Sequence, residues 1–320
     1  MATEGPRRIA PGVYEVPVPV PFSLRRLSAY AVDTDEGWVL IDLGPDLPGA
    51  RRAWMAAERR LGLRPGRVRV AVVTHAHWEH VGLARWAEER WQAPVALLPA
   101  DAAWSEALFR SWQGWETLLA HYRQHGVPDI DLARIRRRAE RLRLTVHLPS
   151  RWLILQHGDA FGHGANRVVI LAQPGHTDGN LVAYHPASQI LFAGDQILSR
   201  VTPNIGYRPG GLADPLGAYL KALPALAALP VQWTWPAHED PLAALSPRIE
   251  ALEAHHRQRL EAVRQAVGTG APAYAVLQAL FGPRLTATHL QLALDETLAH
   301  LEHLRHHGLL RWRDGRYEPA

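Results

Sequence analysis

The sequence predicts an α/β (α+β) protein with a helical insertion in its first part and a separate C-terminal part. Two observations support this prediction. Over residues 1–245, short apolar runs typical of strands mix with helical patterns, as they do in an α/β core. Within about 101–143, and again from residue 246, the periodicity is mainly helical. We therefore predict a first domain at 1–245, with its insertion at about 101–143, and a second domain at 246–320.

Extended and helical segments alternate in the first third of the chain. In residues 13–20 apolar residues alternate with others, and Pro17, Pro19 and Pro21 remove backbone donors, so we expect an edge strand or an extended arm. Further strands are predicted at 27–32, 38–41, 68–73 and 95–98, and helices at about 48–61 and 81–91.

The sequence of the insertion predicts two or three helices, joined near residues 126–128. Strands are then predicted at 144–148, 152–156, 167–172, 181–184, 190–193 and 231–235, with a helix near 216–228. In the C-terminal part, Ser246 can N-cap a helix and Pro247 fits its first turn. Helices near 247–267, 273–281 and 288–307, followed by an Asp-Gly hairpin, predict a small winged-helix-like domain.

Length and composition limit the class of protein. The 320 residues suffice for about two domains, and 47% hydrophobic with 21% charged residues exclude a disordered or collagen-like chain. Without cysteine there is no disulfide, no thiolate site and no cysteine nucleophile, so every metal ligand must be nitrogen or oxygen. No apolar stretch resembles a secretory leader or a membrane span, and we therefore expect a cytoplasmic protein without membrane contact.

The densest group of candidate ligands follows the predicted strand at 68–73. Residues 74–80 read Thr-His-Ala-His-Trp-Glu-His. A strand that ends in a tight loop can direct His75 and His77 toward one point, with Glu79 and His80 directed toward a neighbouring point. Two adjacent metal sites with nitrogen and oxygen ligands require such an arrangement.

Three further candidate ligands also follow predicted strands. His176 comes after 167–172, Asp195 after 190–193 and His238 after 231–235. The carboxyl ends of strands in layered α/β folds gather on one edge, where ligands bind. We therefore expect these side chains to join the group at 75–80. The chain contains no Gly-x-Ser-x-Gly and no Gly-x-x-x-x-Gly-Lys motif, which leaves metal-assisted chemistry as the best explanation.

With these motifs, residues 13–241 resemble the metallo-β-lactamase-fold superfamily of metallohydrolases. Relatives carry His-x-His-x-Asp-His, then a His before Thr, an Asp after Gly and a final His. The resemblance implies a four-layer αβ/βα sandwich that binds two divalent metal ions. It assigns His75, His77 and His176 to the first ion, Glu79, His80 and His238 to the second, Asp195 as a bridge and Asp42 as a support behind the ligands.

The implied reaction is hydrolysis by a metal-activated water, with Asp195 or Glu79 relaying the proton. Zinc is the expected metal, and iron or manganese are the alternatives because these ligands suit several metals. Glu79 stands where relatives usually have Asp. Its extra methylene displaces the carboxylate by ~1.5 Å, against a tolerance of about ±0.2 Å, so we expect the second metal to bind conditionally.

A small ester, thioester or lactone is the expected substrate, because the Trp-rich insertion could close the groove that a polynucleotide needs. The expected pocket residues are Trp104, Trp112, Trp115, Asn204 and Tyr207. The C-terminal part resembles an endoribonuclease-like branch of the superfamily, so RNA or phosphodiester hydrolysis is the main alternative. Two further alternatives for the function are a metal-sensing DNA-binding regulator and a mononuclear-iron oxidoreductase. The sequence does not decide whether the protein forms a homo-oligomer.

Two charge patterns bear on nucleic-acid partners. The basic run at 134–143 spreads its arginines around most of a helix, which favours a solvated surface over a phosphate-binding track. Residues 247–320 contain nine arginines and eight acidic residues, a balance that argues against DNA binding by the C-terminal part.

Overall fold

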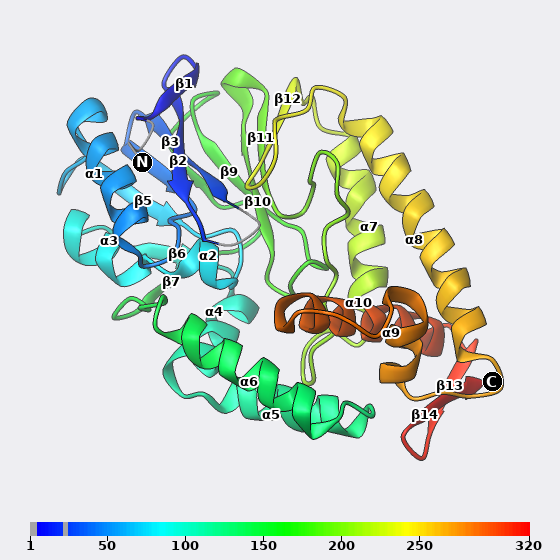
Figure 1. The fold of residues 1–320 in the computed structure, drawn as a ribbon. Helices are drawn as coiled ribbons and strands as arrows, with labels where there is room; N and C mark the ends of the chain where they lie inside the picture. The colour runs from blue at the N-terminus through cyan, green and yellow to red at the C-terminus, as the bar shows by residue number, and fades with distance from the viewer. Residues whose placement is uncertain (1–4, 22–24) are drawn as a thin grey trace.

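Two β-sheets form the centre of the protein, and helices cover their outer faces (Figure 1). The structure, a computed structural model, describes residues 5–21 and 25–320; residues 1–4 of the predicted first domain and residues 22–24 lie outside this description. One sheet has the strand order β1 (Arg7–Ala10), β2 (Val13–Pro19), β3 (Arg26–Thr34), β4 (Gly37–Ile41), β5 (Val68–Val72), β6 (Val95–Leu97) and β7 (Trp152–Ile154). The other has the order β12 (Trp233–Pro236), β11 (Ile190–Gly194), β10 (Leu181–His185), β9 (Val168–Ala172) and β8 (Ala160–Phe161).

Alternating side chains build the layers. In β4, Leu40 packs with α1 (Pro48–Leu61) and α3 (Ala84–Trp91), whereas Ile41 packs between the sheets. In β11, Phe192 packs between the sheets, whereas Leu191 packs with α7 (Pro215–Ala227) and α8 (Leu245–Val267). Both faces of each sheet are therefore buried, in the order helix, sheet, sheet, helix. This order confirms the predicted αβ/βα sandwich.

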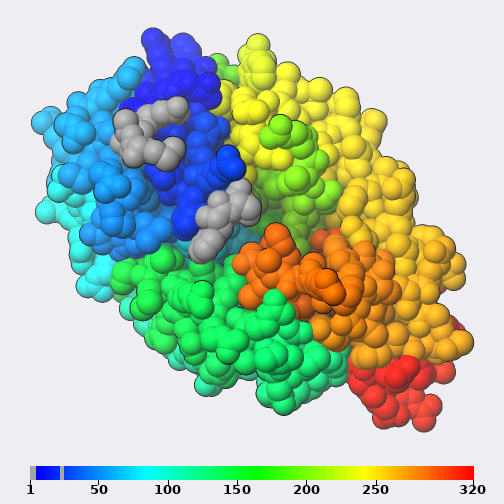
Figure 2. All heavy atoms as spheres, in the orientation of Figure 1, coloured from blue at the N-terminus to red at the C-terminus, as the bar shows by residue number. Residues whose placement is uncertain are grey.

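The insertion packs against the C-terminal helices (Figure 2). It comprises α4 (Pro99–Ser105), a π-helical turn (Glu106–Arg110), α5 (Gln113–Gln124) and α6 (Asp129–Arg143). The C-terminal part continues from α8 through α9 (Ala273–Phe281) and α10 (Ala287–His306) to the hairpin of β13 (Leu310–Arg313) and β14 (Arg316–Pro319). Tyr122 donates a hydrogen bond of 2.5 Å to Asp295 of α10. The winged-helix-like character of this part stays a prediction.

Three element predictions need correction. Residues 144–148 form no strand, because their backbone bonds to the loop at Asp46 and to Gly82 instead of to a strand. Residues 13–20 are not a simple edge strand, because β1 covers the first half of β2 and leaves open only the half that contains Pro17 and Pro19. The helix predicted at 81–91 is divided into α2 (Trp78–Val81) and α3.

Gly82 lies at this division. A Cβ at this position would be 2.5 Å from the carbonyl oxygen of Thr145 and 2.6 Å from Cα of Pro45. Only glycine allows this close approach of three backbone segments. In the described residues, no helix is long and apolar enough to cross a membrane.

Two buried histidines make the stability of the C-terminal helices depend on pH. His256 of α8 and His300 of α10 are inaccessible to solvent, with Nδ1 of His256 3.2 Å from Nε2 of His300. Burial lowers the pKa of His256 to about 3 and that of His300 to about 4. The unfolded chain takes up these protons near pH 6.5, whereas the folded chain does not. Stability is therefore lost as the pH falls from about 6.5 toward 4.

We expect the free energy of unfolding to fall by about 2 kcal/mol for each of these two imidazoles between pH 7 and pH 5. Urea unfolding at a series of pH values measures this change. His300→Gln should flatten the dependence, and His289→Gln, at an exposed position of the same helix, should not. A dependence that persists unchanged in His300→Gln contradicts this account.

Candidate metal centre

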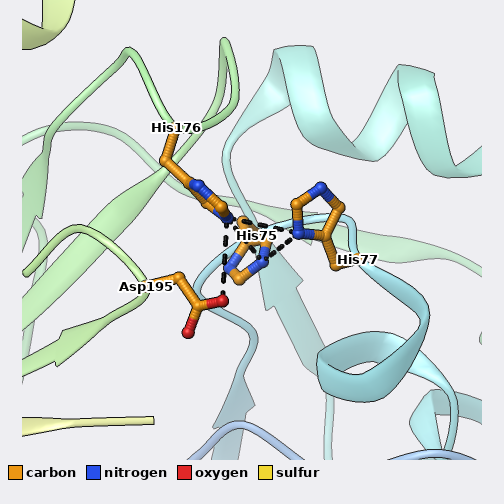
Figure 3. Close-up of side chains that lie close together, drawn as sticks. All are labelled: His75, His77, His176 and Asp195. Carbon is orange, nitrogen blue, oxygen red and sulfur yellow. Dashed lines mark hydrogen bonds and ion pairs between the residues drawn. The ribbon is translucent and has the colours of Figure 1, made fainter. Parts of the chain in front are cut away.

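Four side chains meet where strands β5, β9 and β11 end (Figure 3). His75 and His77 lie in the loop after β5, His176 follows β9 and Asp195 follows β11 directly. Nε2 of His75 is 2.8 Å from Nδ1 of His77, and Nε2 of His176 is 3.2 Å from each of these atoms. Oδ2 of Asp195 lies 3.8 Å from Nε2 of His176. Three ring nitrogens and one carboxylate oxygen therefore converge on one point.

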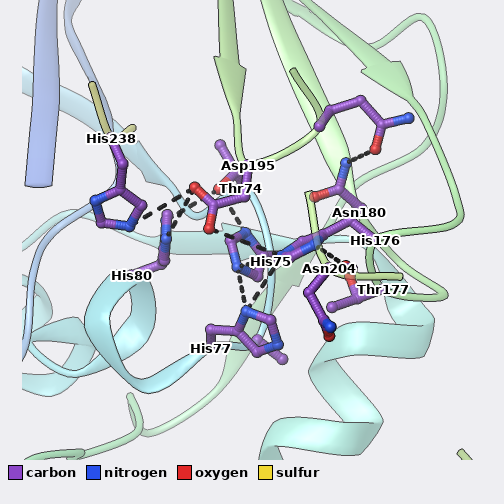
Figure 4. Close-up of polar contacts among 12 residues, drawn as sticks. Thr74, His75, His77, His80, His176, Thr177, Asn180, Asp195, Asn204 and His238 are labelled. Carbon is purple, nitrogen blue, oxygen red and sulfur yellow. Dashed lines mark hydrogen bonds and ion pairs between the residues drawn. The ribbon is translucent and has the colours of Figure 1, made fainter. Parts of the chain in front are cut away.

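A second group lies on the other side of Asp195 (Figure 4). Glu79 and His80 belong to α2 and His238 follows β12, with one potential ligand atom from each within 4.8 Å of the others. Oδ1 of Asp195 is 3.6 Å from Nε2 of His80 and 3.8 Å from Nε2 of His238. Each oxygen of Asp195 faces one group, so its carboxylate is positioned to bridge two cations.

Unsatisfied polar atoms test whether this pair of groups suits a cation. Among the described residues, Oε2 of Glu79, Nε2 of His80, Oδ1 of Asp195 and Nε2 of His238 are buried without a hydrogen-bond partner. Buried polar atoms are normally paired, and leaving four together in one place is costly. Imidazole nitrogens and carboxylate oxygens are ligands that divalent metals accept. The donor set therefore fits the two-metal site that the sequence predicts.

Hydrogen bonds behind the ligands fix which ring nitrogen faces the site. Nδ1 of His80 lies 2.9 Å from Oδ2 of Asp42, Nδ1 of His176 lies 2.7 Å from the carbonyl oxygen of Asn204, and Nδ1 of His238 lies 3.0 Å from that of Arg26. Because only a protonated Nδ1 can donate to these oxygens, Nε2 keeps its lone pair for a metal. Asp42 thus takes the supporting position that the resemblance assigned to it.

The electrostatic environment favours a cation. Burial, reinforced by the neighbouring imidazoles, lowers the pKa of His75 well below its usual value, so this ring stays neutral and available as a ligand. Burial opposes protonation of His80 too, but the charges of Asp42 and Asp195 outweigh it and raise the pKa of His80 well above its usual value. The same negative field would attract a divalent cation in place of that proton.

Asp101 of α4 connects the loops that carry the first group, and the sequence pattern did not single it out. Its buried carboxylate accepts hydrogen bonds from the amides of Ala76 and Gly179, from Oγ1 of Thr177 and from Nη2 of Arg208, at 2.9, 2.9, 2.5 and 2.9 Å. Ala76 lies between two ligands and Thr177 follows a third. Asp101 comes soon after β6, so the strand-end rule that identified the ligands could have identified it too.

A cavity of about 1100 Å³ lies over both groups. Its lining includes His77, Glu79, His176, Asp195 and His238, and its apolar wall includes Leu108, Phe109, Leu118 and Leu142. Of the predicted pocket residues, Trp104, Trp115, Asn204 and Tyr207 line it. Trp112 does not line this cavity, because it packs beside Trp115 and beneath the guanidinium of Arg143.

The basic run lies only partly on a solvated surface, because Arg134 and Arg138 are half-buried, whereas Arg137 and Arg141 are exposed as expected. Arg134, Arg137, Arg138 and Arg141 line the cavity over the ligands. Their positions follow the i, i+3, i+4, i+7 spacing of a single helix face. Arg136 lies on another face of α6 and lines a separate, smaller pocket. The packing of α6 against α10 decides which face points inward, and the sequence does not show that packing.

Comparison with known protein families identifies the family of this chain. The model of the metallo-beta-lactamase superfamily matches residues 25–238, which contain both groups of candidate ligands. The chain belongs to the metallo-beta-lactamase superfamily. A second family model, described as the metallo-beta-lactamase-like C-terminal domain, matches residues 260–319.

Individual members of the superfamily resemble the chain over nearly its whole length. A metallo-beta-lactamase family protein from Thermus thermophilus is 31% identical, with a TM-score of 0.84 over 98% of this chain and 100% of that one. A beta-lactamase domain protein from Burkholderia ambifaria is 27% identical, with a TM-score of 0.85 over 98% and 94%. The probable metallo-hydrolase YqjP of Bacillus subtilis (strain 168) is 25% identical over 298 residues, or 91% of each chain. Superfamily membership supports an enzyme that binds divalent metals.

A substitution of Glu79 tests whether its carboxylate binds a metal in the second group. We expect Glu79→Asp to change the affinity for the second metal by about tenfold or more, because the carboxylate moves by ~1.5 Å against a tolerance of about ±0.2 Å. Elemental analysis of protein dialysed against graded metal concentrations measures the stoichiometry. Glu89→Asp, which alters an exposed ion pair with Arg85, should leave the metal content unchanged. Equal second-metal affinity in the wild type and Glu79→Asp would show that the carboxylate is not a ligand.

Proposed function

We propose that this protein hydrolyses a small ester, thioester or lactone with the help of two divalent cations, zinc in the first instance. One observation supports this most strongly. Two groups of ligands share Asp195 at one side of a cavity with aromatic and aliphatic walls. Such a cavity can hold the apolar part of a small substrate while the polar groups orient its reacting carbonyl.

The ligand groups divide the work between them. His75, His77 and His176 would hold one cation and Glu79, His80 and His238 the other, with Asp195 between them. When bound, such cations supply a water of lowered pKa and polarise the substrate oxygen. The surrounding imidazoles hold the pKa of Asp195 well below its usual range against the effect of burial, so this carboxylate stays ionised and suits a bridging ligand better than a proton store. Glu79 is then the favoured proton acceptor, through the carboxylate oxygen that does not bind the cation.

The contacts of the C-terminal hairpin favour a hydrolase over a DNA-binding regulator. Arg311 pairs with Glu318 at 3.4 Å, Arg313 pairs with Asp314 at 3.5 Å, and Arg316 donates to the carbonyl oxygen of Gly270. These arginines already have partners that compete with phosphate groups. The name of the relative from Bacillus subtilis, a probable metallo-hydrolase, agrees with this proposal.

A panel of substrates on protein with its native metals tests the proposal. Turnover of esters, thioesters or lactones by protein with close to two metal ions per chain is the expected result. Cleavage of single-stranded RNA without turnover of any small substrate would overturn it in favour of a nuclease. Duplex DNA binding that Asp195→Ala leaves intact, without any hydrolysis, would favour a regulator. Iron as the sole metal, with consumption of oxygen, would favour an oxidoreductase.

A further inference from the structure

We propose that Arg137 and Arg141 of α6 bind an anionic group of the substrate, a phosphate or a carboxylate, inside the cavity that contains the metal ligands. This inference rests on the proposed function and narrows its substrate class. The substrate would be an ester or thioester with an acyl part for the apolar wall and a negatively charged part for these two guanidinium groups.

The face of α6 that points into the cavity supplies two kinds of arginine. Arg134 donates to Asp131 at 2.6 Å and to the carbonyl oxygen of Leu285 at 2.5 Å. Arg138 donates to Oγ1 of Thr288 and Oε1 of Gln291, both at 2.9 Å. These two arginines fasten α6 to the C-terminal part, and part of their donors is already used.

Arg137 and Arg141 differ from their neighbours. Both are exposed and line the cavity, and neither guanidinium has a hydrogen bond or an ion pair with any described residue. Their i, i+4 spacing places their side chains next to each other on the helix. Two adjacent guanidinium groups without protein partners present donors in the fork geometry that matches phosphate and carboxylate oxygens.

The carboxylates of the cavity do not neutralise this pair. Glu79 and Asp195 belong to the metal-ligand groups, Glu239 lies 3.6 Å from Arg200, and Asp295 accepts the hydroxyl of Tyr122. Asp240 also lines the cavity but forms no ion pair with either arginine within the described residues. The α6 wall therefore keeps uncompensated positive charge that faces the substrate space.

Two thioesters that differ in charge test the proposal. Butyryl-coenzyme A carries phosphates, and butyryl-N-acetylcysteamine has the same thioester without them. In the metal-loaded, full-length protein, Arg137→Gln with Arg141→Gln should raise KM for the phosphorylated thioester by roughly tenfold to a hundredfold. It should leave kcat/KM for the neutral thioester within about twofold. Arg136→Gln with Arg59→Gln is the control, because it removes the same charge from exposed positions that do not line the cavity.

Binding supplies a readout that does not depend on turnover. ADP should raise the melting temperature of the wild type and of the control pair, and raise it less in Arg137→Gln with Arg141→Gln. Any contact of the ADP phosphates with the metals is common to all three proteins, so it does not contribute to the difference between their melting-temperature shifts. If neither thioester nor any ester or lactone of the substrate panel is hydrolysed but ADP binding still requires this arginine pair, the proposed function fails while the anion site stands.

Three other outcomes would overturn the anion site or the small substrate. Equal KM values and equal ADP shifts in the double variant and in the control overturn the anion site. Equal losses on both thioesters in the double variant also overturn it, because they indicate a distorted cavity. Cleavage of a short single-stranded RNA that needs Arg137 and Arg141, with no thioester turnover, assigns the phosphate to a polynucleotide and overturns the small substrate.

Discussion

Asp195→Asn should lower kcat/KM by at least roughly a hundredfold and reduce the bound metal from about two ions per chain toward one or none. The reason is geometric, because one oxygen of this carboxylate faces each ligand group, 3.8 Å from His176 on one side and 3.6 Å from His80 on the other. Asparagine keeps the shape of the side chain but replaces one oxygen with an amide that cannot bind a cation. Steady-state kinetics and elemental analysis of the same preparation measure both effects.

Asp240→Asn is the matched control, because Asp240 lines the same cavity without belonging to either ligand group. Its kcat/KM and metal content should stay within about twofold of wild type. If Asp195→Asn retained two metals and full activity, the bridging role would be wrong. Similar circular dichroism spectra of both variants would establish that any loss does not come from unfolding.

Asp101→Ala should lower the free energy of unfolding by about 3–5 kcal/mol. It leaves the buried guanidinium of Arg208 with Asp178 as its one ionic partner among the described residues, and it leaves two backbone amides unpaired. Ala76 lies between His75 and His77, and Gly179 lies in the loop that carries His176. Metal affinity at that group should therefore fall by about 10- to 100-fold as well. Urea unfolding and competitive metal titration measure the two effects.

Two further variants separate the causes. Asp129→Asn removes a carboxylate from an exposed ion pair with Arg123 and should cost less than about 1 kcal/mol. Asp101→Ala combined with Arg208→Met removes the guanidinium that has lost one of its two carboxylates, and should recover part of the stability but not the metal affinity. If metal affinity returned together with stability, Asp101 would act only through the charge of Arg208.

The grouping of the candidate metal ligands was predictable because strand ends are local features of the sequence. His75, His176 and His238 each follow an apolar run, and the strands of an α/β sandwich bring such ends together. Asp101 obeys the same rule. It was missed because a single aspartate beside the start of a helix is an ordinary N-terminal residue unless its partners are known.

The cavity wall was less predictable, since it depends on contacts between distant segments. The inward direction of Arg137 and Arg141 follows from the packing of α6 against α10, about 150 residues further along the chain, as the bond from Arg138 to Thr288 shows. Trp112 was expected in the pocket on composition alone. Its left-handed backbone (φ 69°) at the start of α5 instead turns it toward Arg143.

Helix α10 has a consequence for how substrate range can change during evolution. Thr288, Gln291 and Leu292 of this helix line the cavity, yet they lie some fifty residues after the last candidate ligand, His238. Substitutions there can reshape the substrate space without touching the metal-binding motifs, so selection can alter specificity and leave hydrolytic chemistry intact. Two members that share every ligand can therefore differ in substrate, and conservation of the motif alone is a poor guide to what a given member hydrolyses.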